Sequence, residues 1–370
     1  MRFFAALFTV LTAFAQPPVG SRAFRLDELQ TPPGFEASVY ANVPAPRLMT
    51  FGTNGVLYIA SSATGSVFAV SGPGNVVVAL RGLPEPHSVT FQGTSLFIGA
   101  GDGVYRADNA IPSDLVIRSR PMRIITLPVG GQHSTRTASS GPDGKLYVTA
   151  GSTCNFCIES DPRRATAMRS NIDGSNQEIF ARGLRNSVGL AWHPVTGELW
   201  ATDNGGDGLG NDIPPDEINI LREGGDYGWP DCYANQQPVD WGPGARVDRC
   251  GSTLAPQVAL QAHSAPLGIS FYTGAQFPPG YFNDAFVAFH GSWNRDTPTG
   301  YKVVRVHTGR RIEVEDFLWG FLDLNSRTTS GRPVDPVMGP DGALYVSDDL
   351  TGNIYRVVYT GRPARRRWGG

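Results

Sequence analysis

The sequence predicts an all-β protein built as a six-bladed β-propeller. Short segments that alternate apolar and polar residues recur about six times, at spacings of roughly 45 to 75 residues, which is typical of propellers. No stretch has the length and amphipathic periodicity of a stable helix. The 45 glycines and 29 prolines among the 370 residues supply the many turns that such short strands require.

Each predicted repeat contains an inner strand, a turn, a second strand, a loop and a third strand. Two GPDG turns, at 141–144 and 339–342, occupy the same place in their repeats. A strand at 34–43 precedes the first repeat, and we expect it to pair beside the last repeat and remove the open edge of the ring. The repeats begin near Arg47, His87, Arg136, Asn186, Leu267 and Arg332.

Four segments are predicted along the chain. Residues 1–15 have the form of a signal peptide, because Arg2 precedes an apolar run that ends in the A-x-A pattern of a cleavage site. Residues 16–33 form a Pro-rich lead, 34–360 a single propeller domain, and 361–370 a basic C-terminal tail that we interpret as a solvated end. The apolar run is too short to span a bilayer comfortably. We therefore expect a secreted or periplasmic protein without an integral membrane segment once it is mature.

The composition indicates a folded globular protein and disfavours two classes of partner. Of all residues, 41% are hydrophobic and 17% are charged, and the formal net charge is -2. A chain without excess positive charge is poorly suited to nucleic acid or to an anionic membrane surface. The sequence therefore favours a small molecule as the ligand.

The four cysteines fit an oxidising compartment. We expect disulfides, most simply Cys154 with Cys157 and Cys232 with Cys250, although four cysteines allow three connectivities. A zinc site made of all four thiolates is the alternative. Covalently attached haem is disfavoured because Ile158 rather than histidine follows the CNFC motif.

Cationic and polar residues recur where the inner strands begin. In a propeller these positions converge on one mouth of the central channel, and guanidinium groups match the carboxylates of a planar polyanion. The alternative is that each arginine pairs with a carboxylate of a neighbouring blade. We expect cofactor contacts from several of these residues, which are Arg47, His87, Arg136, Arg185, Asn186 and Arg332.

Two further features of this mouth indicate a catalytic base and a metal-binding loop. His133 stands just before an inner strand, where a neutral imidazole can accept a proton from a substrate hydroxyl, although ordinary hydrogen bonding is the alternative role. The loop after Asp203 offers backbone carbonyls at Gly205 and Gly206 beside several carboxylates, a ligand set suited to Ca²⁺ although not spaced as in an EF-hand. The aromatic rings Trp192, Trp200, Trp229 and Trp293 either stack on a ligand or pack in the core.

The ordered set of motifs resembles the PQQ-dependent glucose/sorbosone dehydrogenase family. It comprises DEINILREGGDYGWP, GLRNSVGLAWHP, HSTRTASSGPDGKLYVTAGS and GRPVDPVMGPDGALYVSDD, while GSTCNFC, AHSAPLGISFY and FHGSWNR resemble its sorbosone dehydrogenase-like branch. The resemblance extends from about Gly34 to Tyr359. It implies an exported six-bladed propeller that binds pyrroloquinoline quinone (PQQ) with Ca²⁺.

The resemblance also implies roles for individual residues. His133 matches the catalytic base, and Arg185 with Asn186 matches the pair that contacts the quinone. The carbonyls of Gly205 and Gly206 match those offered to the quinone-bound calcium. Arg332 matches an arginine that holds the carboxylates of the cofactor, while Glu217 and Tyr227 fall in a block that holds a structural calcium in relatives.

The sequence departs from the family pattern at three places. Ser152 stands where the soluble glucose dehydrogenases have an aspartate that supports the base, and Val334 replaces a second cofactor arginine. The family's cofactor lysine has no clear counterpart, so His290, Trp293 or Arg295 of the HGSWNR segment are candidates to replace it.

The reaction implied by the resemblance is oxidation of an aldose or of a sugar aldehyde such as sorbosone. His133 would take the proton of the hydroxyl while hydride passes to PQQ, and the electrons would then leave to an external acceptor, a cytochrome or a quinone. Two alternatives remain open on the same fold: a calcium-dependent hydrolase of the lactonase type, and a non-catalytic propeller that binds glycan or protein. The residues do not specify the sugar, the acceptor or the oligomeric state.

Overall fold

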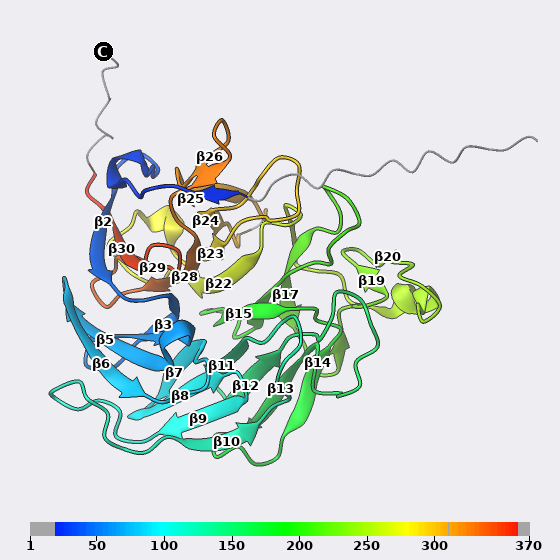
Figure 1. The fold of residues 1–370 in the computed structure, drawn as a ribbon, viewed down its shortest axis with the longest axis horizontal. Helices are drawn as coiled ribbons and strands as arrows, with labels where there is room; N and C mark the ends of the chain where they lie inside the picture. The colour runs from blue at the N-terminus through cyan, green and yellow to red at the C-terminus, as the bar shows by residue number, and fades with distance from the viewer. Residues whose placement is uncertain (1–18, 310, 362–370) are drawn as a thin grey trace, which may run out of the picture.

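The computed structural model describes residues 19–309 and 311–361 (Figure 1). In this part of the chain there is no α-helix, and none of its helical segments is long and apolar enough to cross a membrane. The all-β prediction is confirmed. The only helical segments in the described ranges are short 3₁₀ turns: η1 Leu26–Glu28, η2 Ser62–Thr64, η3 Val247–Ser252 and η4 Pro279–Tyr281. The predicted signal peptide (1–15) and nearly all of the basic tail (361–370) lie outside the described residues.

Six sheets of four or five strands make up most of the described chain. The first contains β3 Pro46–Phe51, β4 Leu57–Ser61, β5 Ser66–Gly72 and β6 Asn75–Arg81. The second contains β7 Ser88–Gln92, β8 Ser95–Ala100, β9 Gly103–Ala107 and β10 Met122–Thr126. The third contains β11 Arg136–Ser140, β12 Lys145–Ala150, β13 Thr166–Asn171, β14 Glu178–Arg182 and β18 Gly225–Asp226.

The remaining three large sheets follow the same order. The fourth contains β15 Ser187–Trp192, β16 Leu199–Asp203, β17 Asp216–Leu221 and β21 Val258–Leu260. The fifth contains β22 Pro266–Phe271, β23 Ala285–Phe289, β24 Lys302–Val306 and β25 Val314–Leu318. The sixth contains β28 Pro333–Met338, β29 Leu344–Asp348, β30 Asn353–Tyr359 and β2 Phe35–Asn42. Short additional strands are β1 Gly20–Ser21, β19 Cys232–Tyr233, β20 Gln237–Pro238, β26 Leu322–Asp323 and β27 Thr328–Thr329.

The first strands of the six sheets lie around a common centre (Figure 1). Each contacts the next in the order β3, β7, β11, β15, β22 and β28, and β28 contacts β3 again. β2 pairs antiparallel with β30, so the expectation that residues 34–43 pair beside the last repeat is confirmed. The arrangement is that of a β-propeller, and the pairing of an early strand with the last one covers the edge that β30 would otherwise expose.

The predicted lead, residues 16–33, is described from residue 19 onward and pairs with the region before the last sheet. β1 runs parallel to β27, and Gln30 forms an isolated bridge with Trp319. This segment therefore packs against the propeller domain.

The two GPDG turns share one geometry, as their equivalent placement predicts. In the first turn Gly144 has φ 74°, Gly141 N–H donates to Lys145 O, and Asp143 Oδ1 accepts from Lys145 N–H. The second turn repeats these features, with φ 77° at Gly342. A positive φ at the last position explains the glycine there, because other residues are strained in that conformation.

The core lies between neighbouring sheets. Phe35 of β2, for example, has its ring 4.8 Å from that of Phe277 and 5.1 Å from that of Phe317, which brings the closing strand into the aromatic core of the fifth and sixth sheets. Polar side chains also join the inner strands. Thr137 Oγ1 donates to Val188 O at 2.5 Å. This bond joins β11 to β15 and so holds the first strands of the third and fourth sheets in register.

Both disulfides predicted as the simplest pairing are present, Cys154–Cys157 and Cys232–Cys250. The zinc alternative is wrong, because every cysteine is consumed in a disulfide. Cys232 and Cys250 are buried, whereas Cys154 and Cys157 are partly exposed on the loop after β12.

Candidate functional site

A cavity of about 450 Å³ opens beside the first strands of the third, fourth and fifth sheets. Five of the predicted site residues line it: His133, Arg185, Asn186, Gly205 and Trp293. Asp207 and Asp216, two of the carboxylates expected in the loop after Asp203, also line it. Sequence reasoning missed the others, which are Gln132, Asn155, Asn204, His263, Ala265 and Asn294. The cavity is rich in amides, carboxylates and imidazoles, groups that hydrogen-bond a polyhydroxylated or anionic ligand.

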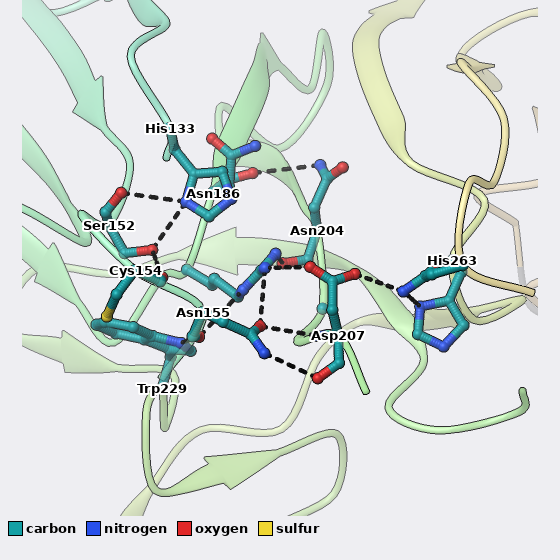
Figure 2. A network of polar contacts seen from close by, with 12 residues as sticks. His133, Ser152, Cys154, Asn155, Asn186, Asn204, Asp207, Trp229 and His263 are labelled. Carbon is teal, nitrogen blue, oxygen red and sulfur yellow. Dashed lines mark hydrogen bonds and ion pairs between the residues drawn. The ribbon is translucent and has the colours of Figure 1, made fainter. Parts of the chain in front are cut away.

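His133 enters this cavity as a neutral imidazole. Burial, followed by the charge of Arg185, lowers the pKa of His133 to about 4. Its Nδ1 lies 3.1 Å from Ser152 O and 2.9 Å from Ser152 Oγ (Figure 2). A backbone carbonyl only accepts hydrogen bonds, so Nδ1 carries the proton and Nε2 carries the lone pair. No partner among the described residues bonds to Nε2. It is therefore available as a base.

Arg185 is buried and is held by several acceptors. Its Nη2 donates to Asp207 Oδ2 at 2.7 Å and to Asn155 Oδ1 at 3.0 Å, and its Nη1 donates to Asn204 O at 3.3 Å. Asn294 Nδ2 donates to the other oxygen of Asp207 at 2.6 Å. The guanidinium is thus fixed beside the cavity and its charge is balanced by one carboxylate.

Asn186 follows Arg185 directly, and its side-chain oxygen is buried without a hydrogen-bond partner among the described residues. A Cβ at Gly151 would lie 2.5 Å from His133 Cβ and 2.8 Å from Asn186 Oδ1. Glycine at this position therefore allows His133 and Asn186 to approach each other. An unsatisfied buried oxygen at the wall of a cavity is suited to a ligand that donates a hydrogen bond.

The glycine loop after β16 is oriented by a buried carboxylate. Asp216 Oδ1 accepts from Gly205 N–H at 2.8 Å, and Asp216 Oδ2 accepts from Ala265 N–H at 2.9 Å. A Cβ at Gly206 would lie 2.0 Å from the ring of Phe156, so the ring packs directly on the backbone. Among the described residues no hydrogen bond reaches either glycine carbonyl. Gly205 lines the main cavity, whereas Gly206 lines only a smaller neighbouring one, and backbone carbonyls of this kind are ligands that a hard cation such as Ca²⁺ accepts.

Glu217 and Tyr227 lie outside the main cavity and line a second one of about 30 Å³. Glu217 Oε1 accepts from Ala234 N–H at 2.7 Å, and Glu217 pairs in register with Asp203 of β16. Burial, followed by the charge of Glu217, raises the pKa of Asp203 to about 8. The hydroxyl of Tyr227 donates to Ile220 O at 2.5 Å, so this hydroxyl has a structural role.

Arg136 and Arg295 do not line the cavity, although both were predicted to contact a cofactor. Arg136 is fully buried, and its Nη1 donates to His133 O at 3.0 Å. Burial, followed by the charge of Arg164, lowers the pKa of Arg136 to about 10. Arg295 donates to Asn211 O and Asp212 Oδ1, each at 2.7 Å. Both arginines thus brace loops at the mouth.

The tryptophans divide between the two roles considered for them. Trp200 and Trp229 are buried, and the indole of Trp229 donates to Asn155 O at 2.9 Å. Trp192 packs edge-on against Tyr147 with ring centroids 4.9 Å apart. Trp293 alone of the four is largely exposed, at 68%, and lines the cavity. It is the ring placed to stack on a ligand.

A second polar cluster joins the first, second, fifth and sixth sheets. Arg47 forms an ion pair with Asp349 and donates from Nε to His87 Nδ1 at 3.3 Å. His290 Nε2 lies 2.9 Å from the other oxygen of Asp349. Burial lowers the pKa of His290 to about 4, although the charge of Asp349 opposes this shift. His87 and His290 therefore have structural partners of their own, and neither lines the main cavity.

Arg332 belongs to the same cluster but differs from the other arginines. Its Nε donates to His290 O at 3.2 Å and its Nη2 to Gly291 O at 3.4 Å, both long contacts. Within the described ranges it forms no direct ion pair, whereas Arg47 and Arg185 each face an aspartate. Arg47 thus pairs with a carboxylate from a neighbouring sheet, whereas Asp207, the partner of Arg185, follows a strand of the same sheet, and Arg332 has no direct ion pair in the described ranges.

Asn155 is the most connected of the residues that sequence reasoning missed. It lies between Cys154 and Cys157 and contacts Arg185, Asp207 and Trp229. Figure 2 shows Asn155 beside Asp207 and Trp229. Its position inside a four-residue disulfide loop was the available signal, because such a loop fixes the backbone of the residues it contains. His263 had no comparable signal. It reaches the cavity through long-range folding, with Nε2 2.8 Å from Gly210 O.

Comparison with known proteins gives a consistent assignment. A family model described as TrAA12-like matches residues 29–360. An uncharacterised protein of Borreliella burgdorferi is 33% identical over 350 residues, which cover 90% of this chain and 91% of that protein. A pyrroloquinoline quinone-dependent sugar dehydrogenase of Hypocrea jecorina is 24% identical over 389 residues, which cover 86% of each protein.

Solved structures share the fold. The calcium structure of the Trichoderma reesei carbohydrate-active enzyme of family AA12 has a TM-score of 0.78 at 22% identity, covering 90% of this chain and 97% of that chain. The holo form of the PQQ domain of a pyranose dehydrogenase from Coprinopsis cinerea has a TM-score of 0.75 at 21% identity, covering 89% and 97%.

Proposed function

Because the chain belongs to the TrAA12-like family, we propose that it is a PQQ-dependent sugar dehydrogenase whose active site is the cavity beside His133. The relative from Hypocrea jecorina is named as such an enzyme, and it matches most of both chains. The observation that carries the proposal is the position of His133 Nε2, unprotonated and open to a cavity that also contains Arg185. A base and a fixed cation side by side are what oxidation of a hydroxyl requires.

The residues present fit the cofactor and its metal. The carbonyls of Gly205 and Gly206 would hold Ca²⁺, and Asp216 fixes the peptide of Gly205 for that role. Arg185 and the unpartnered oxygen of Asn186 would contact the polar edge of PQQ. Arg332 does not line the cavity, but it lacks a direct carboxylate partner in the described chain and is the arginine that would hold a cofactor carboxylate.

PQQ supplies the two-electron acceptor when it is bound. The chain supplies the proton chemistry and the orientation. His133 Nε2 takes the proton of the sugar hydroxyl, while Nδ1–H stays directed to Ser152. Arg185 stabilises negative charge that develops at the mouth of the cavity, and burial strengthens this interaction. The amides around the cavity and the exposed ring of Trp293 orient the sugar.

The finer features of the proposal rest on the sequence and on the arrangement of the sheets. We take the six large sheets to be the six blades of one closed ring, supported by the contacts of successive first strands and by the β2–β30 pairing. Aldoses or sorbosone-like aldehydes are the expected donors, and a separate cytochrome or quinone is the expected electron acceptor. Export follows from the signal-like residues 1–15.

A reconstitution experiment tests the proposal. The purified protein is mixed with PQQ and CaCl₂, aldoses are added, and a redox dye and the quinone absorbance are followed. Dye reduction that requires PQQ, calcium and sugar together is the expected result. A protein that binds no PQQ at micromolar concentration would not be a quinoprotein.

A further inference from the structure

The loop closed by Cys154 and Cys157 contacts three parts of the candidate site: the support of His133, the Arg185–Asp207 pair and the glycine loop. The carbonyl of Cys154 accepts from Ser152 Oγ at 2.7 Å, and Ser152 in turn supports His133. The ring of Phe156 packs on the backbone of Gly206. One short loop therefore touches the support of the base and the glycine loop.

Asn155 lies between Cys154 and Phe156 and hydrogen-bonds both members of the Arg185–Asp207 ion pair. Its Oδ1 accepts from Arg185 Nη2 at 3.0 Å and from Asp207 N–H at 2.8 Å, and its Nδ2 donates to Asp207 O at 2.8 Å. Its backbone carbonyl accepts from the indole of Trp229 at 2.9 Å. Both polar atoms of the amide and the main-chain oxygen are thus used, which fixes the side chain in one orientation.

This geometry depends on the path of the backbone between the two cysteines. No strand contains residues 151–165, so backbone ladders do not hold the loop, and the disulfide is its covalent constraint. Cys154 and Cys157 are partly exposed, whereas the other disulfide is buried. An external dithiol therefore reaches the Cys154–Cys157 bond first.

We propose that Asn155 is a positioning residue for Arg185 and Asp207, and that the Cys154–Cys157 disulfide makes this positioning sensitive to reduction. In the reaction a dithiol gives two electrons and two protons to the disulfide. The Cys154–Cys157 bond breaks to two thiols, and the reductant closes to its own disulfide. The freed loop then releases the Asn155 contacts while the sheets stay folded.

Hydrogen exchange tests this inference without any cofactor. The probes are the amide of Asp207 and the indole N–H of Trp229, both bonded to Asn155. Dithiothreitol should raise their exchange rates at least tenfold in the wild-type protein. The variant Cys154→Ser/Cys157→Ser should show the raised rates already, and dithiothreitol should add nothing to them. Rates that stay within twofold of the oxidised protein in the variant would overturn the proposal.

Substitution of the asparagine separates its role from that of the disulfide. Asn155→Ala should raise exchange at Asp207 with the disulfide intact, because the acceptor is lost. The control is Asn75→Ala, an exposed asparagine that bonds to Ser71. An Asp207 amide as protected in Asn155→Ala as in the control would show that Asn155 positions nothing.

Steady-state kinetics provide a second test of the positioning role of Asn155. Only this test rests on the proposed function. With PQQ, calcium and sugar, Asn155→Ala should lower kcat by about tenfold or more and leave KM within about threefold, since Arg185 acts on the reaction and not on sugar binding. A change in KM alone would overturn the positioning role. If the wild-type protein shows no turnover, the proposed function fails and the exchange rates still decide the role of the loop.

Discussion

His133 Nδ1 lies 2.9 Å from the hydroxyl oxygen of Ser152, and the proton of that hydroxyl is directed to the carbonyl of Cys154. Ser152 therefore accepts from His133 and cannot donate to it at the same time. This relationship fixes the imidazole in the tautomer whose Nε2 is a base. The soluble glucose dehydrogenases that the sequence resembles have an aspartate at this position. Here the neutral hydroxyl of Ser152 orients the imidazole without adding a charge.

Replacing Ser152 tests the orientation. Ser152→Ala leaves only the longer contact of Nδ1 to the backbone carbonyl, so we expect kcat to fall by about 10- to 100-fold with KM little changed. Steady-state kinetics of the reconstituted protein measure this. Wild-type kcat would contradict the role of Ser152.

Ser152→Asp tests the electrostatic difference. His133 is active when neutral, so kcat/KM of the wild type should be lost only as pH falls through about 4, the pKa set by burial and by Arg185, Arg164 and Arg136. A carboxylate beside the ring favours the charged imidazolium and raises its pKa, so the acid limb should move to about pH 5 to 6. If kcat/KM of Ser152→Asp falls at the same pH as that of the wild type, a group other than His133 controls the pH dependence.

Substitution of His133 should abolish most of the turnover without preventing PQQ binding. His133→Ala should retain PQQ binding, because Arg185, Asn186 and the glycine carbonyls remain. Its kcat should fall by about 10²- to 10⁴-fold, the usual contribution of a positioned base. Quinone titration and turnover measured on one preparation check both. Turnover near that of the wild type would make the assignment wrong.

Arg332 should anchor the cofactor. Its two contacts to carbonyls are long and it has no direct carboxylate partner in the described chain, so its donors are available. Arg332→Ala should weaken PQQ binding by about 10- to 100-fold, the value of a charge-assisted hydrogen bond of about 1.5–3 kcal/mol. Arg332→Lys is the matched control and should recover part of the loss. Unchanged affinity in the alanine variant would point to a different anchor.

Asp335 gives a prediction about stability that is independent of the cofactor. Its Oδ2 accepts from Met49 N–H at 2.7 Å, which joins the sixth sheet to the first, and burial raises its pKa to about 8. A raised pKa favours the protonated form in the folded protein. The stability it contributes is present below the unfolded pKa of about 4 and is lost as pH rises through 8.

Asp335→Asn keeps an acceptor for Met49 and cannot ionise. Relative to the wild type it should therefore become more stable as pH rises from 5 to 9, by on the order of 3 kcal/mol over this window. Urea unfolding at several pH values measures the difference. A constant difference across the pH range would show that Asp335 does not titrate there.

The strand repeats and the GPDG turns were predictable because each is local, whereas the pairing of the closing strand with β30 was predicted from the need to cover the open edge of the ring. Strand alternation follows from residues two apart, and the positive φ of the turn glycines needs only the turn itself. The disulfides were predictable in their simplest pairing because the cysteines of each pair are near in sequence. His133, Arg185 and Asn186 were singled out because they stand just before inner strands, and Gly205 because it lies in the glycine- and aspartate-rich loop after β16.

What the sequence alone determined is therefore the all-β class, the recurring strands, the simplest disulfide pairing and several of the polar residues that line the cavity, among them His133 and Arg185. Only the tertiary structure decided which cations face the cavity. Arg136 and Arg295 have the same charge as Arg185, but their terminal nitrogens donate to loop carbonyls or to Asp212. The Asn155–Asp207 contact joins segments 52 residues apart. The physical reason is that burial and hydrogen-bond partners come from distant segments, and no local pattern encodes them.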